Sequence, residues 1–254
     1  MSMERDSLFI RRITLEGDLP ADSYLNRLPV VRYLRDHPIT LEKPVTFFVG
    51  ENGSGKSTLI EAIAVAMGFN PEGGTRNFDF STHATHSPLH EALCIAKGIT
   101  RMKDGFFLRA ESFYNVATNI EEMDRQPAAS PRIIESYGGV SLHNQSHGES
   151  FMALAENRFF GSGLYILDEP EAALSPMRLM RLICRMNELV MRNSQFIIST
   201  HSPILMAFPD ADVLQITESG VERVPFRETE HYQVTKMFLD DPERMLHYLL
   251  AEEE

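Results

Sequence analysis

Residues 45–63 read VTFFVGENGSGKSTLIEAI, and this stretch decides the fold. Residues 50–57 match the pattern G-x-x-x-x-G-K-[ST] in full, after an apolar strand-like run and before a periodic helical run. In such a unit, glycines let backbone N–H groups turn toward phosphate oxygens, and the amino end of the helix adds positive charge. The sequence therefore predicts a phosphate-binding loop. Its residues are Gly50, Glu51, Asn52, Gly53, Ser54, Gly55, Lys56, Ser57 and Thr58.

A second motif ends an apolar run with two carboxylates. Residues 164–169 read LYILDE, which predicts a buried strand followed by Asp168 and Glu169. Asp168 and the Ser57 hydroxyl are expected to hold Mg²⁺, and Glu169 to polarise the attacking water as general base. Lys56 would reach the β- and γ-phosphates. Taken alone, Asp-Glu-Pro could simply begin a helix, but a complete phosphate loop favours the catalytic interpretation.

The rest of the chain alternates between strand-like and helical patterns. Strands are expected at 8–15, 45–49, 105–110, 164–167, 196–199, 213–217 and 221–224. Helices are expected at 56–67, 149–160, 176–191 and 241–250. This alternation predicts an α/β fold with a largely parallel sheet and with its chemistry at the carboxyl ends of the strands.

Composition limits the class of protein. The 254 residues carry a net charge of −12, but twelve acids and four bases place −8 of it within residues 210–254. Bulk charge therefore describes an acidic C-terminal segment and does not decide whether nucleic acid is a partner. Cys94 and Cys184 stand apart without a CxxC pair, and no secretory signal or membrane-length apolar run occurs. A soluble, cytoplasmic protein is expected. No guanine-reading N-K-x-D motif occurs, which favours ATP over GTP.

Three further sequence motifs accompany the phosphate loop and the acidic pair. Residues 146–149, SHGE, stand just before a helical pattern; residues 171–176, EAALSP, directly follow the acidic pair; and His201 ends an apolar strand. With these segments the chain resembles the ABC-type ATPases, and most closely compact bacterial predicted ATPases of their soluble branch. That branch includes RecF, the structural-maintenance-of-chromosomes proteins and the overcoming-lysogenization-defect nucleases. The resemblance covers residues 8–205.

This resemblance implies one domain over residues 1–254. It would have a P-loop ABC head fold, an antiparallel β region and a small helical lobe at roughly 80–160. In this family, Lys56, Glu169 and His201 would be catalytic. Ser146, Gly148 and Glu149 would bind the γ-phosphate of ATP held by a second copy, giving an ATP-dependent, head-to-tail homodimer. Glu111, at the end of the strand expected at 105–110, takes the position of the metal-contacting lid glutamine; a plain strand-end carboxylate is the alternative.

Departures from the family pattern leave several biological roles open. Gln145, His147 and Ser175 replace the leucine and first glycine of the signature and the aspartate of the following loop. A cytosolic ATPase in DNA repair or phage defence is expected. A transporter's nucleotide-binding subunit, or a weakly active ATP sensor that recruits an effector, are the alternatives. Arginines spaced along residues 178–192 would permit DNA as a partner, although a solvated helix face explains them more simply.

Overall fold

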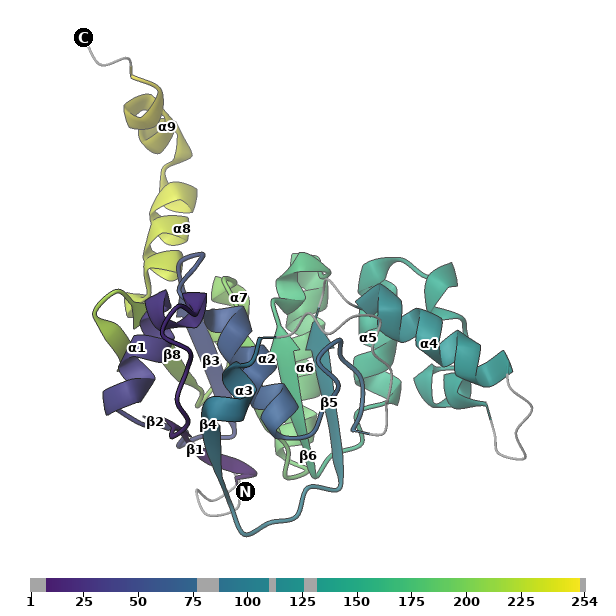
Figure 1. Cartoon of the computed structure of the whole chain (residues 1–254). Helices are drawn as coiled ribbons and strands as arrows, with labels where there is room; N and C mark the ends of the chain where they lie inside the picture. Colours follow the sequence, from purple (N-terminus) through teal and green to yellow (C-terminus); the bar gives the residue numbers. More distant parts are fainter. Residues whose placement is uncertain (1–7, 77–86, 110–112, 126–131, 252–254) are drawn as a thin grey trace.

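A computed structural model describes residues 8–76, 87–109, 113–125 and 132–251 (Figure 1). Its centre is a six-stranded sheet. In spatial order its strands are β5 (Asp104–Arg109), β6 (Gly163–Asp168), β7 (Gln195–Ser199), β3 (Val45–Gly50), β8 (Asp212–Thr217) and β9 (Gly220–Arg223). The first five are parallel, and β9 pairs antiparallel with β8. Every residue of β3, β6 and β7 is buried, as expected for strands covered on both faces.

Helices cover both faces of this sheet. Within the described residues the helices are α1 (Pro29–Asp36), α2 (Lys56–Ala66), α3 (Leu89–Ala92), α4 (Phe113–Arg125), α5 (His147–Asn157), α6 (Pro176–Val190), α7 (Pro203–Met206), α8 (Glu230–Asp240) and α9 (Pro242–Leu250), of which α1 and α2 cover one face and α5 and α6 the other. One core lies between the sheet and α1 and α2, and a second lies between the opposite face and α5 and α6. The fold is thus the three-layer α/β arrangement that the sequence predicts.

A smaller antiparallel sheet packs beside the first and confirms the expected antiparallel β region. Its order is β2 (Ile39–Thr40), β1 (Ile10–Leu15) and β4 (Leu93–Lys97). The fully buried Gln195 joins the two sheets, because its side-chain amide accepts from the Ile10 N–H and donates to the Ile10 carbonyl, both at 2.9 Å. Both ends of the amide are therefore satisfied inside the protein.

The helical lobe is smaller than the range 80–160. Strands β4 and β5 lie within that range and belong to the two sheets, so the lobe consists of α4, α5 and the short 3₁₀ turns between them. β4 has only five residues, LCIAK, and none of them is fully buried, so this short strand is stabilised mainly by its pairing with β1. The helices α1, α4 and α8 also lie outside the helices expected from the sequence.

The last two helices differ from the others. Figure 1 shows α8 and α9 projecting from the body toward the C-terminus, and neither helix buries a side chain. Several of their large apolar side chains are exposed: Val234, Met237, Leu239, Leu246, Tyr248, Leu249 and Leu250. Among the described residues, no helix is long and apolar enough to cross a membrane.

Candidate nucleotide site

The predicted phosphate loop joins the carboxyl end of β3 to the amino end of α2. Gly50, Gly53 and Gly55 adopt φ angles of 146°, 85° and 94°, which L side chains rarely adopt. At Gly50 a β-carbon would also lie 2.4 Å from the Ile216 carbonyl oxygen, so only glycine fits there. The loop has the backbone that a phosphate cradle needs, with the amino end of α2 at its rim.

Lys56 lies buried in this loop, with 4% of its surface exposed. Its Nζ donates to the carbonyl oxygens of Gly50 and Glu51, at 2.8 Å each. Burial lowers the pKa of Lys56, while the nearby carboxylates of Glu169 and Asp168 act in the opposite direction. The Ser54 hydroxyl of the same loop is buried and has no hydrogen-bond partner among the described residues. The loop thus contains a buried cation, held by its own carbonyls, and a buried hydroxyl without a partner.

Asp168 ends β6 and is 5% exposed. Its carboxylate accepts a short hydrogen bond from the Ser199 hydroxyl at the end of β7, and the Arg109 Nε lies 3.5 Å away. Burial raises the pKa of Asp168, whereas hydrogen bonds from Ser199 and Ser57 and the Arg109 charge lower it. The hydroxyl and carboxylate expected to share a divalent cation therefore lie together at this edge of the sheet.

Glu169 has a left-handed backbone, with φ of 47°, which is uncommon for a residue other than glycine. Its N–H donates to the Ser199 carbonyl at 3.1 Å. The side chain is 39% exposed, so its carboxylate is accessible to water, and one of its oxygens lies 3.5 Å from the Nε2 of His201. This geometry suits a group that must exchange protons with solvent.

His201 is held from two sides. Its N–H donates to the Glu171 carboxylate, and its Nδ1 lies 2.7 Å from the Nε2 of His231. Burial lowers the pKa of His201 to about 4, with a further contribution from the Lys56 charge, so the imidazole is neutral at pH 7. The His201 Nε2 is buried and has no hydrogen-bond partner in the described part of the chain.

Sequence reasoning missed Arg109, Glu61 and His231. Arg109 ends β5 and pairs with Glu61 of α2 at 2.7 Å, while Glu61 also accepts from the Ser87 N–H at 2.9 Å. The Arg109 charge therefore bridges α2 and Asp168. A cation directly at the end of a buried strand is a sequence signal for this role. No comparable signal marks His231, which is the second residue of α8.

The signature-like segment lies elsewhere in the chain. Ser146 caps α5: its hydroxyl accepts from the Glu149 N–H, and its own N–H donates to the Glu149 carboxylate at 2.9 Å, which completes a capping box. At Gly148 a β-carbon would lie 2.9 Å from the Ala173 carbonyl oxygen, so glycine allows α5 to approach the loop before α6. Figure 1 shows α5 on the side of α6 away from the phosphate loop. Within the described residues, no hydrogen bond or ion pair joins the two segments.

The arginines of α6 have a structural use. Arg178 pairs with Glu149, Arg181 with Glu156, and Arg185 donates to the backbone carbonyls of residues 155, 156 and 159. They therefore bind α5 to α6 instead of forming a free basic face. Glu111, the expected metal-contacting residue, lies outside the described residues.

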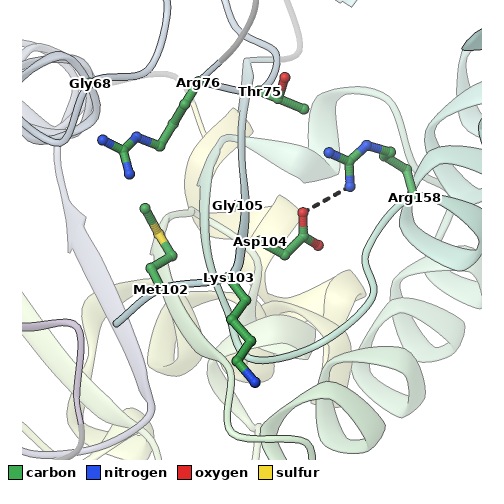
Figure 2. A pocket seen from close by; sticks show the side chains of 8 residues that line it. All are labelled: Gly68, Thr75, Arg76, Met102, Lys103, Asp104, Gly105 and Arg158. Atoms are coloured by element: carbon green, nitrogen blue, oxygen red, sulfur yellow. Dashed lines mark hydrogen bonds and ion pairs between the residues drawn. The ribbon is translucent and has the colours of Figure 1, made fainter. Parts of the chain in front are cut away.

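Two cavities lie at opposite ends of the strands. One, of about 270 Å³, is bounded by residues 50–54 of the phosphate loop, the end of β8, and Glu230 and His231 at the start of α8. Figure 2 shows the other, of about 320 Å³, at the amino end of β5, where an ion pair joins Asp104 and Arg158. The residues lining this second cavity are Gly68, Thr75, Arg76, Met102, Lys103, Asp104, Gly105 and Arg158.

Two family models match the sequence. Residues 30–115 match a model described as an AAA domain, and residues 142–207 match one described as "AAA domain, putative AbiEii toxin, Type IV TA system". The first match contains the phosphate loop, and the second contains the acidic pair and His201. No curated protein matches the chain. The sequence and the fold together define a P-loop ATPase.

Comparison with solved structures shows which P-loop fold the chain has. The cbiO1 structure from Clostridium perfringens, part of the ABC transporter complex cbiONQ, matches over 96% of this chain and 100% of its own, with 16% identity and a TM-score of 0.53. A nucleotide-free ATP-binding cassette from an ABC transporter matches over 96% and 100%, with 18% identity and a TM-score of 0.51. The chain is an ATPase with the ABC-type fold, which confirms the class and the fold that the sequence predicts.

Proposed function

We propose that this protein binds MgATP at the carboxyl edge of the main sheet and hydrolyses it there, with Glu169 as the general base. The observation that carries the proposal is the convergence of three parallel strand ends. Lys56 follows β3, Glu169 follows β6 and His201 follows β7, and the Nε2 of His201 lies 3.5 Å from the Glu169 carboxylate. Ligands of open α/β sheets bind at this edge.

Nucleotide binding would use the phosphate loop as a cradle. Backbone N–H groups of residues 53–58 would donate to the phosphates, and Lys56 would exchange its two loop carbonyls for phosphate oxygens. Ser57 and Asp168 would hold Mg²⁺, which neutralises charge developing on the phosphates when it is bound. Among the described residues, no cluster of three or more acidic, histidine or cysteine side chains could hold a metal alone. This donor set therefore suits an ion that keeps water and phosphate ligands.

In the hydrolytic step, Glu169 would take a proton from a water molecule as the water oxygen attacks the γ-phosphorus. The bond from the γ-phosphorus to the β–γ bridging oxygen breaks, and ADP and phosphate leave. His201, whose Nε2 lies 3.5 Å from the Glu169 carboxylate, would contact the γ-phosphate and orient the attacking water. The exposed Glu169 carboxylate can then release its proton to solvent.

A second copy of the chain would complete the site. Ser146, Gly148 and Glu149 lie apart from the phosphate loop of their own chain, at the amino end of an eleven-residue helix. Such a helix end favours an anion, so these residues would meet the γ-phosphate bound by the partner in a head-to-tail dimer. ATP would then join the two copies, and hydrolysis would release them.

The proposed setting is the cytoplasm, in phage defence or DNA repair. The model matching residues 142–207 is described as a toxin of a type IV toxin–antitoxin system, which supports the defence setting. A second candidate, the nucleotide-binding subunit of a membrane transporter, is favoured by the similarity to transporter cassettes. A third, an ATP sensor that recruits a separate effector protein, is favoured by the replacements at Gln145, His147 and Ser175.

The Glu169→Gln variant tests the proposal, because it removes the base and keeps the size of the side chain. With MgATP, light scattering should show twice the monomer mass of 28.8 kDa, and without ATP the single mass. Lys56→Ala in the same background is the control and should remain monomeric. A monomer with MgATP at micromolar protein contradicts the dimer. DNA-stimulated ATPase activity then separates the DNA setting from the other two, and a pull-down identifies an effector or membrane partner.

A further inference from the structure

His231 is the second residue of α8, the helix that begins beside the phosphate loop and then projects from the body. It lines the cavity next to that loop, together with Glu51 and Gln215. Its ring and that of His201 lie with centroids 4.9 Å apart, and the His231 Nε2 is 2.7 Å from the His201 Nδ1. This short contact joins α8 to the strand end that carries His201.

The protonation of the two imidazoles limits which of them can donate the hydrogen bond in this contact. Burial lowers the pKa of both imidazoles, to about 4 for His201, so both are neutral at pH 7 and each carries one N–H. One ring must therefore donate and the other accept. If His201 donated from Nδ1, its Nε2 would direct a lone pair at the Glu169 carboxylate, 3.5 Å away. If His231 donates, the His201 Nε2 carries the proton and attracts that carboxylate.

We propose that His231 is a positioning residue for the ATPase reaction: its Nε2–H donates to the His201 Nδ1 and thereby fixes His201 in the tautomer with a proton on Nε2. This proposal rests on the proposed function of His201. Phosphate oxygens only accept hydrogen bonds, so a neutral histidine that contacts a γ-phosphate must present an N–H to it. The His201 Nε2 makes no hydrogen bond in the described structure, so this N–H is available to a nucleotide.

The bond also fixes the direction of the ring. The backbone N–H of His201 is tied to Glu171, which places the main chain but leaves the imidazole free to rotate. His231 adds the second point of attachment, on the side of the ring opposite Nε2. A partner that holds one ring nitrogen sets which proton the other nitrogen presents.

The test uses three variants and two readouts. His231→Leu removes the donor, whereas His231→Gln keeps an amide N–H donor at a similar distance along the side chain. His247→Leu, in the exposed last turn of α9, is the matched control. The first readout is the tautomer of His201, from ¹⁵N chemical shifts of imidazole-labelled protein without nucleotide. The second is kcat and KM for ATP.

The wild type should show His201 with its proton on Nε2, and His231→Leu should give a mixture of tautomers. In the same variant kcat should fall about tenfold while KM changes less than about twofold, as expected for a lost orienting hydrogen bond. His231→Gln should stay within about threefold of the wild-type kcat, and His247→Leu should not change either readout.

A wild-type His201 protonated on Nδ1, or a His231→Leu variant with unchanged tautomer and kcat, overturns the proposal. The tautomer spectrum needs no ATP. A protein that fails to hydrolyse ATP but shows the expected tautomers therefore refutes the proposed function and not the role of His231 as hydrogen-bond donor.

Discussion

The two ends of the main sheet use charged groups in opposite ways. At the amino end, the Asp104 carboxylate accepts from Arg158 at 2.8 Å, from the Tyr165 hydroxyl at 2.8 Å and from the Phe160 N–H at 3.0 Å. Both carboxylate oxygens therefore have donors. At the carboxyl end, Lys56 donates to two loop carbonyls, and the His201 Nε2 is buried without a hydrogen bond to any described residue.

This difference separates structural from chemical roles. A partly buried charge whose two oxygens both accept hydrogen bonds fixes geometry, and in Figure 2 the ion pair of Asp104 and Arg158 joins the start of β5 to the end of α5. A buried polar atom without a partner costs stability and marks a place where a ligand can supply the bond. Within the described residues, three hydroxyls nearer the amino end, those of Thr46, Tyr137 and Ser194, also lack hydrogen-bond partners, but they line neither cavity described above and are uncharged.

Removing the cation at the carboxyl end should have the largest effect. Lys56→Ala should reduce ATP hydrolysis by about 10³-fold or more, because the ammonium group is the charge that the protein places against the phosphates. The melting temperature should not fall, since the variant also removes a buried charge. Phosphate release and a thermal melt measure the two quantities. A variant with more than a tenth of the wild-type rate contradicts the assignment of this end to catalysis.

Breaking the network at the amino end should instead reduce stability. Asp104→Ala leaves the Arg158 guanidinium and the Tyr165 hydroxyl without their partner, at a cost of about 3 kcal/mol in the free energy of unfolding. The kcat of the folded protein should remain within about twofold. Denaturant titration measures the loss. Asp240→Ala is the control, because it removes an exposed pair with Lys236 and should cost less than about 1 kcal/mol.

The same comparison predicts how stability depends on pH: an acid limb, along which stability falls as pH decreases, and an alkaline limb, along which it falls as pH rises. The folded-state pKa of His201 is about 4, below the unfolded value of 6.5, so the neutral form is favoured in the fold. Stability should be complete above pH 6.5 and fall by on the order of 2 kcal/mol as pH drops toward 4. His201→Gln should reduce this acid limb, and the remaining part comes from His231, whose pKa is also lowered by burial.

The alkaline limb should depend on the amino end. Burial raises the pKa of Tyr165, so its contribution is complete below pH 10 and is lost as pH rises further. Tyr165→Phe should reduce this limb and leave the acid limb unchanged. Denaturant titrations at several pH values measure the free energy of unfolding along both limbs. A Tyr165→Phe variant in which both limbs change would contradict their separate origins.

The smallest expected effect concerns the cap of α5. Ser146→Ala removes the side-chain acceptor of the capping box and should cost about 1 kcal/mol in stability. Ser175→Ala is a matched control, because Ser175 occupies the same position before α6 without making a side-chain cap bond. Equal losses in the two variants contradict the capping role. A loss of ATP-dependent dimerisation in Ser146→Ala beyond the loss of stability supports its proposed contact with the partner's nucleotide.

Sequence reasoning succeeded where local chemistry and fold agree. A complete phosphate loop between a β-branched strand and a helix, and an acidic pair after LYILDE, each require one position at the carboxyl edge of the sheet. It failed where tertiary contacts decide the structure. β4 is stabilised by its pairing with β1, and His231 reaches the site only because α8 begins beside the phosphate loop. The arginines of α6 bind α5, which periodicity along a single helix cannot show.

The central claim is that the carboxyl edge hydrolyses ATP with Glu169 as base. The rate of phosphate release at saturating MgATP, compared between the wild type and Glu169→Gln, tests it most directly. A general base contributes about 10²- to 10⁴-fold, so the variant should release phosphate at least about a hundredfold more slowly while binding ATP as tightly as the wild type. Equal rates in the two proteins would contradict the account.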